Sequence, residues 1–402
     1  GKNARVTADS LTLDAVKQEV TLKDYVPAFN AEDWVTTNTN GEPAKEGLVH
    51  IQSKNETTGK GYTIKLNFTT NTVLNMIDLM NFLSSTNYYA EAIAGTVVQN
   101  AEGKAISGSI AMVFFYNDIL AAIEDGAQIT MRSASGDIKV NASNVSNTRM
   151  IAGSLAATSG KVGVGAALNF LRNEDTITAR IGDNVLLSAG QDNLGSSLPL
   201  GGLTLSAEAA SDAWLITAAV AAATGASATA VGGTINVMAP ESTVRAAIGT
   251  GSRIYADGPV VISAKSSAML VPIAASLAGS TGTAAGGTLQ IIVSANRAYA
   301  DIGENVLIHS TDDVTLSAEN KDSLISVLAS ASGSTGTNPT LAGTLNVLIS
   351  RTIAHAAVGA GATIKAHNLL INAQAASKLL TVMAAVSGST GGTAAGATVN
   401  VN

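Results

Sequence analysis

Apolar residues recur at every second position in many short segments of this chain. The clearest segments are rich in valine, isoleucine and leucine and lie at residues 260–264, 313–318, 344–349 and 369–373. A period of two with β-branched residues predicts strands that turn one face toward a core. Turn-forming residues separate the predicted strands, as in Asp257-Gly258-Pro259 and Ala366-His367-Asn368.

One of these segments returns at a fixed spacing. The phrase Gly-Gly-Thr-apolar-Asn-Val begins at residue 232 and recurs, with small changes, at residues 286, 342 and 396. Its threonines are 54, 56 and 54 residues apart, at Thr234, Thr288, Thr344 and Thr398. A fixed period means that each unit buries its apolar face against its neighbours. The sequence therefore predicts an all-β fold, a parallel β-helix (β-solenoid) of about 55-residue repeats.

The sequence is compatible with two different numbers of coils per repeat. Strand starts inside one unit fall about 18 residues apart, which suits one coil, at Thr344, Ala362, Leu380 and Thr398. We therefore predict three coils per repeat, which places equivalent residues of successive repeats roughly 14 Å apart. The alternative is one wide coil per repeat, which would align a ladder of polar residues, Asn236, Gln290, Asn346 and Asn400.

The two parts of the chain differ in composition. Residues 1–88 are expected to form an irregular, aromatic-richer segment, and residues 89–402 a repeat array that is incomplete at its C-terminus. Helical spacing of apolar residues predicts a short helix near residues 72–84. A surface loop insertion around residues 191–199 explains one longer repeat. We expect the chain to be a segment of a longer protein.

Aromatic residues are concentrated at the start of the chain. Eleven of the fifteen lie at or before Tyr116. Exposed tyrosine and tryptophan side chains make efficient contacts with partners. The predicted partner-binding residues are Tyr25, Trp34, Tyr88 and Tyr89, and the helix near 72–84 is either a cover over the solenoid or a further binding element.

Composition narrows the function classes. Apolar residues make up 46% of the chain and charged residues only 13%, and small residues dominate, so a narrow interior is expected. A net charge of −7 argues against nucleic-acid binding and provides no basic patch for a membrane surface. The absence of cysteine excludes disulfides and thiolate metal sites.

Three segments carry no charge for more than 20 residues: Ser266 to Asn296, Leu324 to Ser350 and Leu379 to Asn402. Their length alone would allow a transmembrane helix. Each segment contains the sequence Gly-Ser-Thr-Gly, which disfavours a helix that spans lipid. We therefore predict buried strands and no stable transmembrane segment.

Candidate metal ligands do not form a recognised pattern. The histidines lack zinc-site spacing, although the last two could approach on adjacent coils: His50, His309, His355 and His367. Aspartates in turns lack the glycine-rich calcium repeat and are expected to be solvated, with stray calcium as the alternative: Asp125, Asp183, Asp312 and Asp313. We predict no metal and no cofactor.

Candidate catalytic residues are equally sparse. Enzymes built on parallel β-helices cluster carboxylates or basic residues on one strand face, whereas here Glu208, Lys265 and Glu319 are interpreted as isolated. The glycine-rich stretch 160–165 has Val162 where a phosphate-binding loop needs serine or threonine, which favours a strand of small residues. We predict no catalytic residue and no enzyme, with a polysaccharide-cleaving enzyme as an alternative.

The repeat resembles that of a known family. Its pattern runs from Ala284-Ala285-Gly286-Gly287-Thr288 through Ala300-Asp301-Ile302-Gly303 to Val314-Thr315-Leu316-Ser317-Ala318-Glu319. This pattern looks like the repeats of the filamentous adhesins related to the fusobacterial leukotoxin, which are broadly similar to filamentous haemagglutinins. The resemblance covers residues 89–402 and implies export by an outer-membrane route, an extended β-helical rod, and roles in adhesion or toxicity. It carries over no catalytic residue.

The expected function is therefore that of a structural and adhesive rod segment of a large secreted or cell-surface bacterial protein. Its partners would be a host-cell receptor, a glycan or copies of itself, and its location extracellular or on the cell surface. One alternative is a membrane-active toxin segment, because the uncharged strands could pair in a bilayer. Another is a self-associating extracellular filament subunit, because exposed strand edges favour end-to-end stacking.

Overall fold

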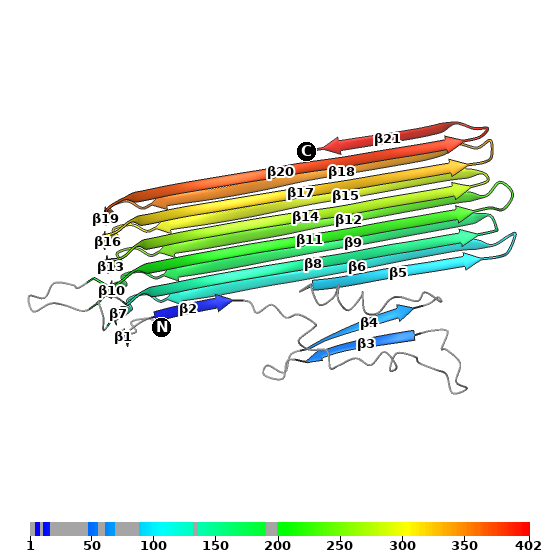
Figure 1. Ribbon diagram of the computed structural model, residues 1–402. Coiled ribbons are helices and arrows are strands. Elements are labelled where there is room, and N and C mark those ends of the chain that lie inside the picture. Colours follow the sequence, from blue (N-terminus) through cyan, green and yellow to red (C-terminus); the bar gives the residue numbers. More distant parts are fainter. Residues whose placement is uncertain are drawn as a thin grey trace, which may run out of the picture.

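The computed structural model describes residues 5–8, 11–16, 47–54, 61–68, 88–131, 136–189 and 199–402, with side chains from residue 90 onward. In these residues the chain forms three sheets of stacked parallel strands (Figure 1). The predicted parallel β-helix is confirmed.

Each coil contributes one short strand and two long strands. The short sheet contains β1 (Arg5–Ala8), β7 (Gln128–Met131), β10 (Leu186–Ser188), β13 (Arg253–Ala256), β16 (Leu307–Ser310) and β19 (Thr363–Lys365). Sheet 2 contains β2 (Leu11–Val16), β5 (Tyr88–Val98), β8 (Ile138–Thr158), β11 (Leu203–Ala223), β14 (Val260–Ser280), β17 (Val314–Ser334) and β20 (Leu369–Ser389). Sheet 3 contains β6 (Lys104–Ile123), β9 (Val162–Ile181), β12 (Thr229–Ile248), β15 (Thr283–Ile302), β18 (Thr340–Val358) and β21 (Ala394–Val401).

Each repeat makes one wide coil, so the prediction of three coils per repeat is wrong. Thr234 of β12 is the Cα partner of Thr288 of β15, which is in turn the partner of Thr344 of β18. Equivalent residues of successive repeats therefore lie one strand spacing apart, about 4.8 Å rather than 14 Å. The 18-residue spacing does not correspond to turns, because Leu380 lies inside the 21-residue strand β20.

The first coil is assembled from two separate parts of the chain. β2 pairs with the first residues of β8, and β5 pairs with the last eleven residues of β8, from Thr148 to Thr158. β1 likewise pairs with β7 of the short sheet. Part of the segment 1–88 therefore belongs to the stack.

An antiparallel hairpin of β3 (Gly47–Lys54) and β4 (Gly61–Phe68) falls between β2 and β5 in the sequence. The predicted helix near residues 72–84 lies outside the described residues, as does the insertion at 191–198. The division of the chain at residue 88 stays a prediction.

The turns that follow sheet 3 place a left-handed residue at the same point of successive coils. Glycine and asparagine adopt this conformation at lower cost than other residues, because Cβ contacts penalise it elsewhere. The φ angles lie between 53° and 71° at Gly126, Asn184, Gly251, Asn305 and Gly361. This requirement explains part of the glycine and asparagine content of the repeat.

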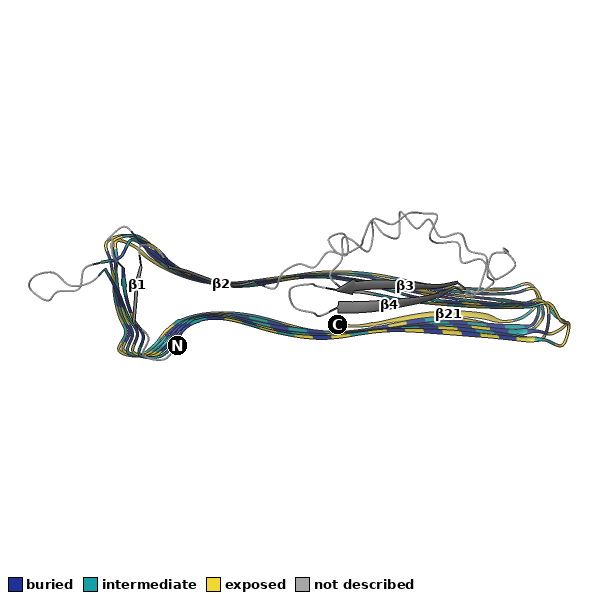
Figure 2. Cartoon of the chain, turned by 90° about the horizontal axis from the view of Figure 1, so that it is seen from below, coloured by how far each residue is buried: buried dark blue, intermediate teal, exposed yellow. Residues whose placement is uncertain are grey.

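The core changes character along the coil. Beside the short sheet, large aliphatic side chains such as Leu205, Ile262 and Leu316 are completely buried. Toward the opposite end the buried cluster consists of alanine alone. Figure 2 shows the short sheet closing one end of the coil and the two long sheets extending from it and facing each other. The molecule is a slab, thicker at the short sheet.

Glycine is required where the two long sheets approach most closely. A Cβ added to Gly232 would lie 2.7 Å from the carbonyl oxygen of Leu277 on the facing sheet. A Cβ added to Gly286 would lie 2.7 Å from the carbonyl oxygen of Ala331. Because each of these oxygens belongs to the backbone, it cannot move away by a change of side-chain rotamer. The first glycine of the Gly-Gly-Thr phrase therefore permits the thinness of the slab.

Candidate binding surface

A column of amide side chains runs through the interior of sheet 3. Asn169, Asn236, Gln290 and Asn346 occupy equivalent positions on successive strands and are completely buried. Gln290 Nε2 donates to Asn346 Oδ1 at 3.1 Å, and Asn346 Nδ2 donates to Asn400 Oδ1 at 2.8 Å. This is the polar ladder that the one-coil alternative predicts.

The same amides connect the two long sheets. Asn169 Nδ2 donates to Thr217 Oγ1 of β11 at 2.9 Å. Asn236 Nδ2 donates to the carbonyl oxygen of Ile273 on β14 at 3.1 Å. An unsatisfied buried polar group costs about 1–3 kcal/mol, so these bonds help to fix how the sheets face each other.

The part of the outer face of these strands that lies farther from the short sheet is apolar, and we call it the apolar face. It consists of four columns of outward residues that are all apolar: aliphatic residues, one methionine, one phenylalanine, alanine and glycine. Column 1 contains Ile106, Val164, Val231, Ala285, Leu341 and Ala395. Column 2 contains Gly108, Ala166, Gly233, Gly287, Gly343 and Ala397, and column 3 contains Ile110, Leu168, Ile235, Leu289, Leu345 and Val399. Column 4 contains Met112, Phe170, Val237, Ile291, Val347 and Val401.

The usual polarity of a strand is therefore inverted here. In β18, Thr344 and Asn346 point inward and are buried, whereas Leu345 and Ile349 point outward and are exposed. The interpretation of the uncharged segments as buried strands is thus correct for only one face of this strand. In β17, by contrast, the alternation places Leu316 in the core, as the pattern suggests.

A groove crosses the apolar face from the first coil to the last. Its floor is column 2 and one wall is column 3, and its volume is about 940 Å³. The wall side chains are well exposed, with 62% of Ile110 and 37% of Ile235 accessible. Soluble proteins rarely leave a contiguous apolar surface of this kind uncovered, so it is the leading candidate for a binding surface.

The part of sheet 3 nearer the short sheet has a charged outer face. Arg180 pairs with Glu124 of the preceding coil, and Arg245 pairs with Asp301 of the following coil at 3.0 Å. His355 Nδ1 lies 3.3 Å from Asp301 Oδ1. Exposed ion pairs of this kind contribute about 0–1 kcal/mol each to stability. They therefore favour the correct alignment of neighbouring coils but add little to the stability of the stack.

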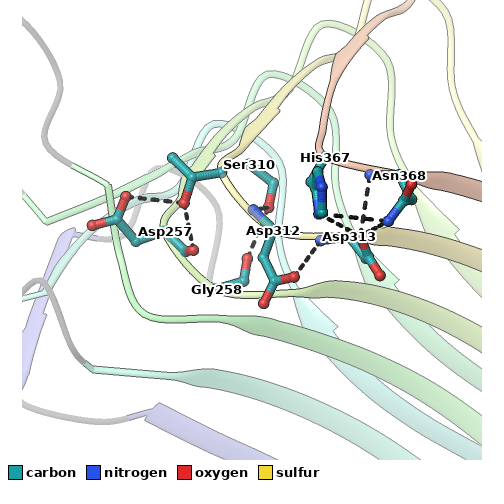
Figure 3. Close-up of polar contacts among 8 residues, drawn as sticks. Asp257, Gly258, Ser310, Asp312, Asp313, His367 and Asn368 are labelled. Carbon is teal, nitrogen blue, oxygen red and sulfur yellow. Dashed lines mark hydrogen bonds and ion pairs between the residues drawn. The ribbon is translucent and has the colours of Figure 1, made fainter.

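A second polar cluster lies where the short sheet turns into sheet 2 (Figure 3). Asp313 Oδ1 accepts hydrogen bonds from the backbone nitrogen and the Nδ2 atom of Asn368, at 3.1 and 2.7 Å. Asp312 Oδ1 accepts from the backbone nitrogen of Asp313 at 2.8 Å, and Ser310 Oγ donates to the carbonyl oxygen of Gly258 at 2.9 Å. The contacts of Asp313 with Asn368 and of Ser310 with Gly258 join the turns of adjacent coils, which gives the cluster a structural role.

The turns after sheet 3 use their aspartates in the same way. Asp125 Oδ1 accepts from the backbone nitrogen of Asp183, and Asp183 Oδ1 accepts from that of Thr250, at 3.0 and 2.7 Å. Each carboxylate therefore caps the turn of the next coil. Within the described residues, no group of three or more histidine, aspartate or glutamate side chains is placed to hold a metal ion.

The structure does not bring His355 and His367 together. His355 lies against Tyr299 with ring centroids 6.0 Å apart, whereas His367 Nδ1 lies 3.6 Å from Asp313 Oδ1 at the corner of the coil. His309 packs against Tyr255 of the preceding coil. Each of these histidines therefore belongs to a different row of stacked side chains.

The charged residues that the sequence shows as isolated are neighbours in space. Lys265 of β14 is the Cα partner of Glu208 on β11 and of Glu319 on β17. Only the register shows this alignment, because the three residues lie far apart in the chain. The alternating signs form a surface row on sheet 2.

The four predicted partner-binding residues are placed only in part. Tyr25 and Trp34 lie outside the described residues. Tyr88 and Tyr89 begin β5 and are the Cα partners of Thr148 and Arg149 on β8. The apolar face was missed because alternation identifies two faces of a strand without saying which one turns inward.

One ionisable group inside the slab has a perturbed pKa. Asp322 of β17 accepts hydrogen bonds from Asn296 Nδ2 at 2.8 Å and from Thr352 Oγ1 at 2.7 Å. Burial raises the pKa of this carboxyl above its usual 3.8, although both hydrogen bonds act in the opposite direction. The ionised form is therefore disfavoured in the folded protein.

Replacing Asp322 by asparagine is expected to raise the thermal midpoint at pH 7 and to have little effect at pH 3. Because the folded pKa is raised, the carboxyl stabilises the fold below its unfolded pKa, and that contribution is lost as pH rises through the folded value. Thermal unfolding followed by circular dichroism between pH 3 and pH 7 checks this. A difference between variant and parent that stays constant with pH would contradict it.

In the described parts of the chain, no helix is long and apolar enough to cross a membrane. Comparison with known proteins identifies no relative: no protein family, no curated protein and no solved structure matches this chain. The function is therefore argued from the architecture and its surfaces.

Proposed function

We propose that this chain is a structural and adhesive segment of a large secreted or cell-surface bacterial protein of the filamentous-adhesin type. The observation that carries the proposal is the unbroken register of the stack. β11 pairs with β8 on one side and with β14 on the other at every one of its 21 residues. Continuous pairing of this kind makes a stiff scaffold whose coils contact only their neighbours.

The width of the coil decides what such a scaffold is suited to do. One coil adds about 4.8 Å of height for about 55 residues, so the stack gains only about 0.09 Å per residue. Strands of 21 residues extend for about 70 Å, so each coil is far wider than it is high. The design favours a broad, flat surface over a long reach, which supports adhesion more than a role as a thin stalk.

The adhesive role predicts saturable binding of the labelled 402-residue chain to host epithelial cells in flow cytometry. A variant with Tyr25→Ser and Trp34→Ser is expected to bind at least tenfold more weakly, because aromatic side chains supply much of the binding energy at such interfaces. The matched control is Tyr255→Ser with Tyr299→Ser, which changes aromatic residues on the stacked coils. No saturable binding by the parent chain, or equal loss in both variants, would contradict the proposal.

A membrane-active segment is the second candidate, and the apolar face is the observation that favours it. Such a surface would gain about 25 cal/mol for each Å² of apolar area transferred into lipid. Release of a trapped dye from liposomes at micromolar protein, without cell binding by intact chain, would favour this candidate over adhesion.

A further inference from the structure

The floor of the groove contains glycines that the fold does not need. A Cβ added to Gly233 or Gly287 would meet no atom within 4 Å, and one added to Gly343 would find its nearest neighbour at 4.0 Å. Glycine inside a strand costs roughly 0.5–1 kcal/mol relative to alanine, because it loses more conformational freedom on folding. Outward glycines in a strand often mark a place where another backbone approaches closely.

The neighbouring glycines provide a direct contrast. Gly232 and Gly286 point inward, and a Cβ at either would collide with the facing sheet. Gly233 and Gly287 follow them in the chain and point outward. The first residue of each Gly-Gly pair is therefore explained by the packing inside the slab, and the second is not.

A polar outer face of a sheet can stay in water, as the charged row on sheet 2 does, whereas a contiguous apolar face is rarely left uncovered. Sheet 3 is covered by sheet 2 on its inner face, and its apolar face has no cover among the described residues. Leaving Ile110, Ile235 and Leu345 in water forgoes the stabilisation that burial of aliphatic side chains provides. A second sheet on this face accounts for the inverted polarity of sheet 3 and for the glycine floor of its groove. The outer face of sheet 2 also contains free glycines, at Gly279, Gly333 and Gly388, and therefore supplies the control.

We propose that the apolar face is an interface between two copies of this chain, packed sheet to sheet. A two-fold axis along the stacking direction, between columns 2 and 3, would exchange these columns between the copies. The ridge of column 3 in each copy would then lie in the glycine-floored groove of the other. One surface thus supplies both the ridge and the groove, as an isologous interface requires.

The size of the face fits this partner. Four columns cover seven residues along each strand, about 23 Å, and six strands cover about 29 Å. Two such faces would bury on the order of 1,300 Å², which falls within the range of stable specific interfaces. A single extended ligand would cover the groove alone and leave columns 1 and 4 exposed, so a flat partner accounts for more of the surface.

Analytical ultracentrifugation of the whole chain tests the proposal with two matched pairs of substitutions. Gly233→Val with Gly287→Val fills the groove without a clash inside the slab. The control, Gly279→Val with Gly333→Val, changes two glycines on the outer face of sheet 2, where an added Cβ also meets nothing within 4 Å. Thermal unfolding of each variant reports whether the coil itself is intact.

The parent chain is expected to sediment as a dimer with twice the monomer mass of 40.3 kDa. The groove variant is expected to dimerise at least 100-fold more weakly while its monomer keeps an equal or higher thermal midpoint. The sheet 2 control is expected to remain dimeric. Dimerisation also predicts that no parent protein floats with phosphatidylcholine vesicles.

Four results would overturn the proposal. They are a parent chain that stays monomeric up to 100 μM, assemblies that grow beyond the dimer, equal weakening in both valine pairs, and flotation of the monomer with the vesicles. The last result would identify lipid as the occupant of the apolar face.

Discussion

Replacing Gly232 by valine is expected to lower the free energy of unfolding by about 3 kcal/mol or more, because the new side chain cannot fit between the sheets. Its Cβ would lie 2.7 Å from the carbonyl oxygen of Leu277, and relief requires the two long sheets to separate. Sheet 2 cannot separate locally without disturbing pairing in the adjacent coils. The midpoint of urea unfolding, followed by circular dichroism, measures the loss.

The adjacent residue provides the control. Gly233→Val introduces the same side chain one position later, where it points outward into open space. At protein concentrations at which both are monomeric, that variant is expected to be as stable as the parent or up to about 1 kcal/mol more stable, because valine suits a strand better than glycine. Equal destabilisation at both positions would show that glycine serves backbone flexibility rather than close packing.

Replacing Gln290 by leucine is expected to cost about 2–4 kcal/mol, although leucine is more apolar and of similar size. Gln290 Nε2 donates to Asn346 Oδ1 and to Ser326 Oγ, both on strands that stay in place. The leucine variant leaves those buried oxygens without this donor. Thermal and urea unfolding of the purified variants measure the effect.

Gln290→Asn is the matched control for this column. Asparagine occupies the equivalent position in the neighbouring coils, at Asn236 and Asn346, so an amide is retained and most of the stability should be retained with it. If the leucine variant proves as stable as the parent, the polar column contributes nothing to holding the sheets together.

The repeat and its turns could be predicted from the sequence, whereas the size of the coil could not. A period of about 55 residues fits one wide coil as well as three narrow ones, because alternation within a strand carries no information about its end. The deciding signal was present in the chain. An amide side chain recurs at the same place in each repeat, at Asn236, Gln290, Asn346 and Asn400. Only stacking at a single strand spacing lets these amides hydrogen-bond to one another.

The candidate surface was harder to predict for a related reason. Alternation places Leu345, Val347 and Ile349 on one face of their strand, and apolar faces usually turn inward. Here the neighbouring positions hold Thr344, which is buried, and Asn346, whose side-chain amide hydrogen-bonds to the amides of the adjacent coils. The orientation therefore depends on contacts between residues more than 50 positions apart, which a local pattern does not contain.

One coil per repeat also sets how the stack must form. In sheet 3, paired residues of β12, β15, β18 and β21 are 54 or 56 residues apart, so no shorter loop brings two coils together. Closing such loops costs conformational entropy, and this cost is offset only after hydrogen bonds form between the paired strands. We therefore expect pairing of the first two coils to be the slow step of folding, because each later coil adds to an edge that already presents its register.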